Sequence, residues 1–311
     1  MRRQLVSLVA IGTVLISGAM RAQEKDAKHV FVTALDKSGT PIVGLTREHF
    51  AVRESDRDRD VLAVEPLRTP MHVAVLVDTS IANGAPDETF RSAVLGLIDR
   101  LAATNHVAVY SFGDRAAKVA EFSQDAAQLR SAATGMFGWS QERSLLIDAL
   151  DMALRDFERV ESPRPVIIAI SSERPEASRQ TAGGVIRRLI AQSVAFHAIS
   201  VTGAAAGTAA GAGTDIPAKS QRLSGMVAAG EGDRERNQAL EQGTSATGGG
   251  RQRVTSILAL AGALGRVANE LANSYKVTFA RPGSARMQDL QVGLLVEGVT
   301  LRATAAPFGT R

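Results

Sequence analysis

A run of apolar residues, Val73–Val77, ends abruptly at the polar residues Asp78, Thr79 and Ser80. Because the run is short, continuous and rich in β-branched side chains, it predicts a strand buried on both faces, as in parallel sheets. Comparable runs follow, separated by segments whose apolar residues recur at helical spacing. The predicted strands are 73–77, 107–112, 117–122, 166–170, 194–201 and 251–254. The predicted helices are 87–103, 124–134, 144–160, 181–192, 236–242 and 256–272.

The alternation of strands and helices over residues 70–273 is typical of βαβ units. One connection differs, because only the short segment 113–115 separates the second and third strands, and so tight a turn makes them antiparallel. The predicted fold class is therefore α/β. We expect a Rossmann-like domain with a mostly parallel central sheet, one antiparallel edge strand and helices on both faces.

Both ends of the chain predict short strands with alternating apolar and polar residues. One set lies in residues 28–68 and the other in residues 274–305. Neither set alone has the number of strands and the covered face that independent stability requires. We therefore expect the two sets to pair in one small β-domain, and the alternative is a separate C-terminal β tail.

The composition changes sharply after the strand at 194–201. Residues 203–213 are almost only Gly and Ala, and Gly, Ser and charged residues continue to Asp233. Such a composition favours flexible chain over packed structure. The sequence thus predicts a flexible Gly/Ala-rich insertion over residues 203–235.

The N-terminus resembles a secretory leader. A basic start at Arg2 and Arg3 precedes a short apolar run, and small residues follow up to Ala22. We expect a signal peptide over residues 1–22 and an exported protein, periplasmic or secreted. The alternative is a retained N-terminal anchor, which would be the chain's one contact with a membrane.

Charge and cysteine content exclude several classes of function. Removal of residues 1–22 lowers Lys+Arg from 36 to 33 against 32 acidic residues, so the mature chain is close to neutral. Nucleic-acid binding needs a concentrated basic surface, and we expect none here. The chain has no Cys, which excludes disulfides and thiolate metal sites. The expected partner is another protein.

The polar residues that follow the first parallel strand are the first candidates for a site. In open α/β sheets, ligands bind outside the carboxyl ends of the strands. Asp78 supplies a carboxylate at that position, and Ser80 supplies a hydroxyl. Oxygen ligands of this kind suit a hard cation such as Mg²⁺.

At these residues the chain resembles the von Willebrand factor A (vWA) domain family, and its flanking pattern resembles the exported vWA-related proteins of acidobacterial type. The resemblance covers nearly all of the chain beyond the leader. It implies a metal-ion-dependent adhesion site, built from a D-x-S-x-S motif, a Thr and a second Asp. The matching positions in this chain are Asp78, Ser80, Ala82, Ser144 and Ser172.

Measured against that motif, the site is degenerate. Ala82 replaces the second Ser, Ser144 stands for the Thr, and Ser172 replaces the second Asp. One carboxylate with hydroxyls would hold Mg²⁺ or Mn²⁺ only weakly. We therefore expect weak metal binding at Asp78, Ser80, Ser144 and Ser172, if any. The adjacent Glu173 is a possible substitute acid and a candidate contact for a partner.

The loops at this edge also carry candidate contacts for a protein partner. Asn83 lies in the loop after the first strand, and Phe137 and Trp139 precede Ser144. Exposed aromatic residues on loops are frequent anchors of protein interfaces. The two aromatic residues could equally pack under the loop as part of the core.

Motifs for catalysis are missing from the sequence. It has no G-x-S-x-G elbow after a strand, no H-E-x-x-H and no Walker loop, and the five His residues are scattered. We expect a non-catalytic module for protein binding, adhesion or scaffolding, with the degenerate metal site described above. The alternatives are a weakly Mg²⁺-dependent adhesion module and an envelope hydrolase that uses the same edge.

Overall fold

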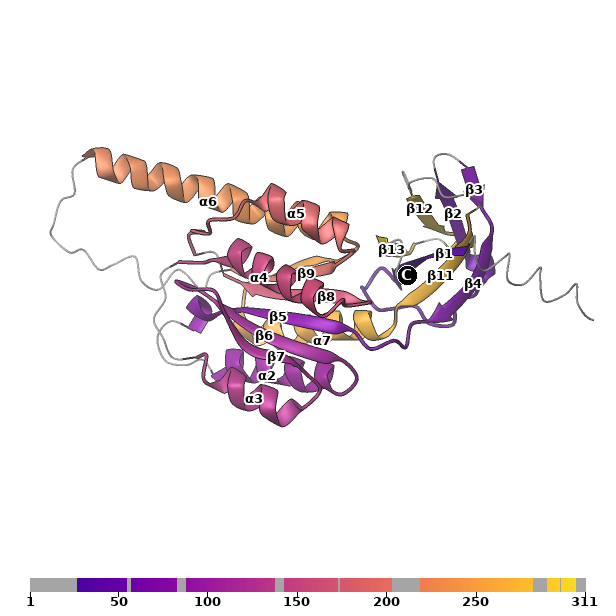
Figure 1. The fold of residues 1–311 in the computed structure, drawn as a ribbon, viewed down its shortest axis with the longest axis horizontal. Helices are drawn as coiled ribbons and strands as arrows, with labels where there is room; N and C mark the ends of the chain where they lie inside the picture. Colours follow the sequence, from indigo (N-terminus) through magenta and orange to yellow (C-terminus); the bar gives the residue numbers. More distant parts are fainter. Residues whose placement is uncertain are drawn as a thin grey trace, which may run out of the picture.

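The computed structural model of the protein describes residues 27–54, 57–82, 88–137, 143–172, 174–202, 219–281, 290–296 and 298–305. The predicted leader, 1–22, lies outside these ranges, as do residues 203–218 of the predicted insertion. The described residues form a six-stranded sheet between two layers of helices, beside a smaller region made mainly of strands (Figure 1). None of the helices in these ranges has the length and apolarity that a membrane span requires.

The central sheet has the predicted architecture. Its strands are β5 (His72–Asp78), β6 (His106–Phe112), β7 (Ala117–Ser123), β8 (Pro165–Ser171), β9 (Ala195–Val201) and β10 (Arg251–Val254). They lie in the order β10-β9-β8-β5-β6-β7. All neighbouring pairs are parallel except β6 and β7, which are antiparallel. The predicted α/β fold class is therefore confirmed.

Strand β5 lies in the middle of the sheet and is buried on both faces. Val75 pairs in register with Val109 of β6 on one side and with Ile168 of β8 on the other. Every residue of the run Val73–Val77 is 0% exposed. Because helices cover both faces, neither face of this strand needs polar residues, which explains its continuous apolar sequence.

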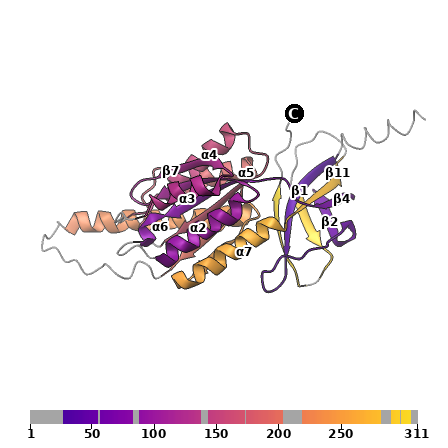
Figure 2. The ribbon, with the colours of Figure 1, turned by 90° about the horizontal axis from the view of Figure 1, so that it is seen from below.

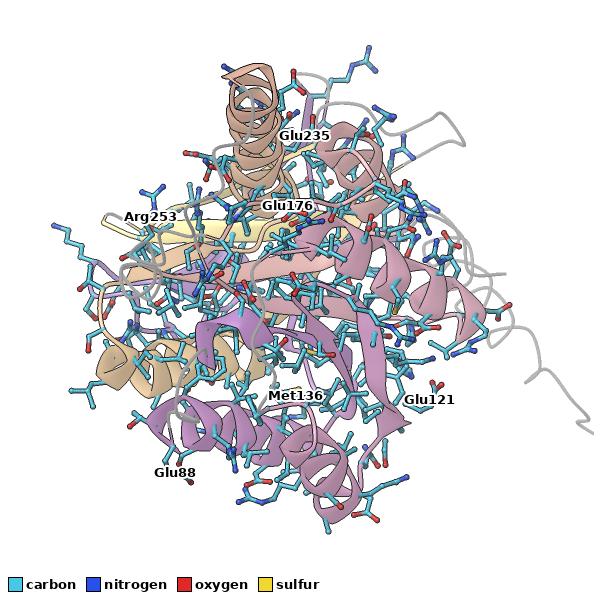
Figure 3. The ribbon with its side chains drawn as sticks, turned by 90° about the vertical axis from the view of Figure 1, so that its left-hand side faces the viewer. Glu88, Glu121, Met136, Glu176, Glu235 and Arg253 are labelled. Atoms are coloured by element: carbon cyan, nitrogen blue, oxygen red, sulfur yellow. The ribbon has the colours of Figure 1, made fainter. Side chains whose placement is uncertain are left out.

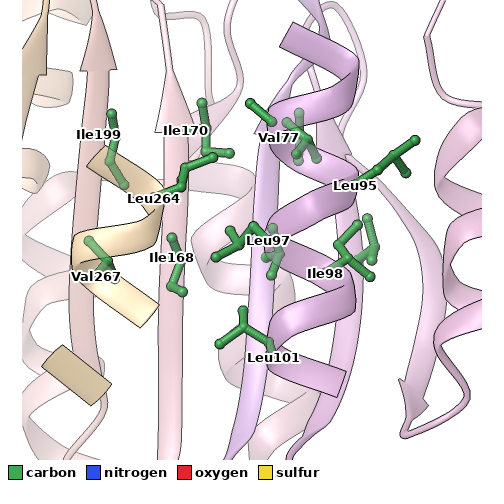
Figure 4. Packing of buried hydrophobic residues seen from close by; sticks show 14 of the residues in the cluster. Val77, Leu95, Leu97, Ile98, Leu101, Ile168, Ile170, Ile199, Leu264 and Val267 are labelled. Atoms are coloured by element: carbon green, nitrogen blue, oxygen red, sulfur yellow. The ribbon is translucent and has the colours of Figure 1, made fainter. Parts of the chain in front are cut away.

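Helices cover the two faces of the sheet in two groups of three. Helices α2, α3 and α7 lie on one face, and α4, α5 and α6 lie on the other (Figures 1 and 2). Their bounds are α2 (Glu88–Ala102), α3 (Ala126–Thr134), α4 (Leu146–Arg159), α5 (Ala182–Ala191), α6 (Lys219–Ala246) and α7 (Leu260–Ala272). Figure 4 shows Leu97 and Leu101 of α2 and Leu264 of α7 packed over the strands. Complete burial of each such side chain contributes about 1.5–3 kcal/mol.

Helix α6 corrects one prediction. Residues 219–235, expected to belong to a flexible insertion, form the first part of this 28-residue helix. Its later part packs against α5 and β9 through Ala239 and Leu240, which are both 1% exposed. The prediction from composition missed this helix because it considers only the content of Gly, Ser and charged residues. It takes no account of tertiary contacts, which stabilise most helices in proteins.

The two ends of the chain build one β region. Strand β1 pairs with both β11 and β13, β4 pairs with β11, and β2 pairs with both β12 and β3. The bounds are β1 (Ala27–Leu35), β2 (Phe50–Glu54), β3 (Arg57–Arg59), β4 (Val61–Pro66), β11 (Tyr275–Ala280), β12 (Leu290–Leu294) and β13 (Thr300–Ala305). Alternate residues such as Val30, Val32 and Val277 face a shared core. The described residues also contain three short 3-10 helices: η1 (Arg47–His49), η2 (Thr79–Ala82) and η3 (Ile257–Ala259).

A polar joint connects the β region to the α/β domain at the amino-terminal ends of the parallel strands. Arg302 of β13 donates two hydrogen bonds to the Glu270 carboxylate of α7, at 2.7 and 2.6 Å. Arg164, which precedes β8, donates to the backbone oxygen of Thr69, in the segment that joins β4 to β5, at 3.3 Å. A Cβ atom at Gly250 would lie 2.4 Å from Arg302 Nη1, so the guanidinium would have to shift if a larger residue stood there.

Candidate functional site

The topology of the sheet creates one natural place for a ligand. When the six strands β5–β10 are numbered 1 to 6 along the chain, their order across the sheet from β7 to β10 is 3-2-1-4-5-6. The order reverses between β5 and β8, and the loops that leave these two strands diverge. In such sheets ligands bind at this switch point, outside the carboxyl ends of the strands. Asp78 ends β5, and Ser172 directly follows β8.

Asp78 is held by four hydrogen bonds from two serines. Its Oδ1 accepts from the backbone nitrogen of Ser80 at 2.9 Å and from Ser80 Oγ at 2.5 Å. Its Oδ2 accepts from the backbone nitrogen of Ser172 at 2.9 Å and from Ser172 Oγ at 2.6 Å. The two hydroxyl oxygens are 3.0 Å apart. The structure thus brings together three of the four predicted site residues.

These three side chains are removed from solvent. Asp78, Ser80 and Ser172 are 0%, 1% and 2% exposed. Burial raises the pKa of the Asp78 carboxyl above its ordinary value, and the hydrogen bonds from Ser172 and Ser80 oppose that rise. The four groups that donate to this carboxylate in the described part of the chain are all uncharged.

Ser144 lies on the neighbouring loop at the same edge. Its backbone nitrogen donates to the oxygen of Pro175 at 2.9 Å, and its own oxygen accepts from the nitrogen of Ala177 at 2.9 Å. These bonds tie Ser144 to the loop that follows Ser172. Its hydroxyl is completely buried and has no hydrogen-bond partner among the described residues.

The residues present fit a divalent cation poorly. A carboxylate has about four lone-pair sites, and four donors from the protein already occupy those of Asp78. The two positions that would add ligand oxygens are Ala82 and Ser172, and Ser172 donates its hydroxyl to Asp78. No group of three His, Cys, Asp or Glu side chains capable of holding a metal occurs in the described ranges. The hydroxyl of Ser144, which has no hydrogen-bond partner among the described residues, does favour a further ligand here.

Of the four residues predicted to contact a partner, the structure describes only Phe137. Phe137 is 8% exposed, and its ring meets Phe90 edge-on with centroids 5.8 Å apart. The guanidinium of Arg91 lies 5.4 Å from the same ring. Phe137 therefore belongs to the core, which corrects its predicted place in a partner-binding surface. Its burial gains aromatic and cation–π contacts that an exposed ring would lose. Asn83, Trp139 and Glu173 lie outside the described residues.

Sequence reasoning missed the role of Glu176. This side chain is 6% exposed and accepts hydrogen bonds from the backbone nitrogens of Ser178 at 3.1 Å and Leu146 at 3.3 Å. Leu146 is the first residue of α4, so Glu176 caps that helix from another loop. Burial raises the pKa of the Glu176 carboxyl. No local signal predicts a cap supplied from 30 residues away.

A pocket of about 820 Å³ opens beside this cap. Its walls are the start of α4, the loop between β8 and α5, and one side of α6. Figure 3 looks onto this edge and labels Glu176, and Glu235 on α6. The volume lies within the range of about 300–1,000 Å³ that is usual for ligand sites. The charged residues that line the pocket are Arg143, Glu176, Arg179, Glu231, Arg234 and Glu235.

No protein-family model and no curated protein matches the chain. Solved structures with a similar arrangement include several vWA domains. The von Willebrand factor type A protein from Catenulispora acidiphila is 11% identical, with a TM-score of 0.45, over 91% of this chain and 74% of that one. The SpRpn10 VWA domain is 13% identical, with a TM-score of 0.39, over 61% of this chain and 93% of that one.

A third similar structure is proximal thread matrix protein 1 from the mussel byssus, whose adhesion-site motif holds zinc. It is 16% identical, with a TM-score of 0.45, and the match covers 70% of this chain and 49% of that one. At such identities these likenesses concern the arrangement of helices and strands only.

Proposed function

We propose that this chain is an exported, non-catalytic protein-binding module, and that the carboxyl edge of its vWA-like domain recognises a protein partner without a bound divalent cation. The observation that carries the metal-free part of the proposal is that all four acceptor sites of the Asp78 carboxylate already receive hydrogen bonds from the protein. These four sites face Ser80 and Ser172, so Asp78 has no free oxygen to offer a metal. The loops around it remain available for contact.

An enzymatic role at this edge has little support. Ser80 and Ser172 are buried and donate to Asp78, so neither presents a nucleophile to solvent. The histidines are elsewhere: His72 and His106 begin their strands at the opposite edge, and His197 lines a cavity at the joint with the β region. The other two, His29 and His49, belong to the β region.

Calorimetry of the full chain with Mg²⁺ and with Mn²⁺ tests the absence of metal binding. We expect no binding in the micromolar range. Asp78→Ala is the diagnostic variant, and Asp36→Ala, which removes an exposed turn carboxylate, is its matched control. Micromolar binding that Asp78→Ala abolishes and Asp36→Ala preserves would overturn the metal-free part of the proposal.

Affinity capture from envelope extract tests the recognition surface. Ala177 is exposed in the loop after β8, so Ala177→Trp adds uncharged bulk at the carboxyl edge, while Ser131→Trp adds the same group on α3. We expect the wild type and Ser131→Trp to retain one partner in EDTA, and Ala177→Trp to lose it. The proposal fails if no partner is retained, or if EDTA releases it.

Export has its own test. Cleavage after Ala22 removes residues 1–22 and three arginines with them. The intact mass of the protein purified from the envelope fraction should therefore correspond to a chain that begins at Gln23. A full-length mass would favour a retained N-terminal segment.

A further inference from the structure

The pocket beside Glu176 contains three arginines without a side-chain partner in the described structure. Arg143, Arg179 and Arg234 line it, and no hydrogen bond or ion pair of their guanidinium groups occurs among the described residues. They come from three separate elements: the segment before α4, the loop before α5, and α6. Three cations gathered in one hollow repel one another unless an anion joins them.

The acidic residues of the same pocket are mostly committed to other tasks. Glu176 caps α4, and Glu235 accepts from the backbone nitrogen of Ala182, the first residue of α5, at 2.5 Å. Both carboxylates thus bind at the positive ends of helices, and neither forms an ion pair with the three arginines among the described residues. Glu231 is the remaining acid; it is exposed and lies on α6.

Close contacts fix the wall of the pocket that α6 provides. A Cβ atom at Gly232 would lie 2.1 Å from the backbone oxygen of Glu176, so the helix touches the loop directly. Arg236 donates to the backbone oxygen of Arg174 and pairs with Asp233 at 3.0 Å. Arg236 is 7% exposed, which marks it as a structural contact, unlike the three exposed arginines. The backbone of this wall is therefore held in place before a ligand binds, whereas the three arginine side chains are ordered only on binding.

The geometry points to this pocket as the binding site for an acidic side chain of the protein partner, with Arg143, Arg179 and Arg234 as its guanidinium donors. The inference rests on the proposed function and names the partner's chemistry. Guanidinium groups pair with carboxylates through two parallel hydrogen bonds, a geometry that lysine cannot supply. A volume of about 820 Å³ accommodates a short peptide segment and greatly exceeds a single small anion.

Fluorescence anisotropy with a fluorescein-labelled pentaglutamate peptide tests this directly on the full chain. At about 0.05 M salt, where screening is weak, we expect saturable binding of pentaglutamate and none of pentaglutamine or pentalysine. Arg143→Gln, Arg179→Gln and Arg234→Gln combined should weaken binding by about tenfold or more. Glu231→Gln removes a repulsive charge and should strengthen binding by about twofold.

A matched variant controls for net charge. Arg57, Arg187 and Arg253 are exposed arginines on β3, α5 and β10, and they do not line the pocket. Their combined substitution by Gln makes the same charge change and should alter pentaglutamate affinity by less than about twofold. All variants should keep the wild-type melting temperature, because exposed arginines contribute little to stability.

Three results would overturn the inference: no pentaglutamate binding by the wild type, equal losses in both triple variants, or inorganic phosphate displacing the peptide at lower concentration than free glutamate. The last result would make the pocket a phosphate site. Failure here differs from failure of the proposed function. If the pocket triple variant still captures the partner from envelope extract, the module binds proteins and only the pocket's role is wrong.

Discussion

Two buried carboxylates, at opposite ends of the same sheet, are held in opposite ways. Glu270 at the joint with the β region takes both of its short hydrogen bonds from the charged guanidinium of Arg302. Asp78 at the carboxyl edge takes all four of its hydrogen bonds from uncharged groups of Ser80 and Ser172. The two acids are almost equally buried, at 4% and 0% exposed. Burial alone therefore does not decide how an acid is stabilised here.

The difference separates a structural joint from a recognition edge. A buried ion pair between two elements is demanding, because loss of either partner leaves an uncompensated charge. Such a pair suits a connection that must not open. A carboxylate held by neutral donors keeps its neighbours in place and leaves the cationic groups of the region, Arg143, Arg179 and Arg234, free to face outward. Asp78 thus holds together the loops at the carboxyl ends of the strands, while the three arginines present positive charge to solvent.

The largest effect is expected at the joint. Glu270→Ala removes the carboxylate that pairs with Arg302 and should lower the free energy of unfolding by about 3 kcal/mol, because a partly buried guanidinium loses its counter-charge. Urea unfolding measures the change. Asp99→Ala, which breaks the exposed pair with Arg130, is the control and should change stability by less than about 1 kcal/mol. If the two variants lowered the free energy of unfolding equally, the pair of Glu270 with Arg302 would contribute no more than an exposed ion pair.

The contrast between the two carboxylates also marks what the sequence could predict. The apolar run Val73–Val77 followed by Asp78 was sufficient to place a buried strand and its polar end, because both signals are local. The bonds from Ser172 to Asp78 join residues 94 positions apart and depend on the neighbouring register of β5 and β8. The resemblance placed Ser172 near Asp78, but nothing local indicated that the two would saturate each other.

Other features escaped prediction for the same reason. Glu176 caps a helix that begins 30 residues earlier, and residues 219–235 are helical in a segment where composition favoured a loop. The sequence alone allowed Phe137 to be exposed or buried. In the structure it is buried, because its ring packs against that of Phe90. In each case a contact between distant segments outweighs the local preference.

A smaller effect on stability, and one that depends on pH, is expected at Asp78, whose hydrogen-bond donors are uncharged. Burial raises the pKa of Asp78 in the folded chain above its ordinary value of 3.8. The folded state then binds the proton more tightly than the unfolded state, so the stability from this group is complete below pH 3.8 and is lost as pH rises through the folded pKa. Asp78→Asn removes this titration and should differ from the wild type by about 2 kcal/mol at most.

Urea unfolding of the wild type and Asp78→Asn across acidic and neutral pH measures that difference. The advantage of the wild type should be greatest at low pH and should shrink as pH rises. Asp36→Asn, at an exposed turn, is the control, and its lowered pKa predicts the opposite slope. An advantage that grows with pH at Asp78 would mean that the four donors outweigh burial, and that the site stabilises a full negative charge.

The smallest effect is expected at Ser144, and it is the most direct check on whether the carboxyl edge is complete without a ligand. Its buried hydroxyl has no hydrogen-bond partner in the described structure, whereas that of Ser172 donates to Asp78. Ser144→Ala should therefore leave the free energy of unfolding unchanged or raise it by less than about 1 kcal/mol, because an unpaired buried hydroxyl is unfavourable. Ser172→Ala, the matched variant, should lower it by about 1–2 kcal/mol. A loss of similar size in Ser144→Ala would show that this hydroxyl binds a water molecule or a cation. Repeating the measurement in EDTA would then separate the two, since only a cation would make the loss depend on the chelator.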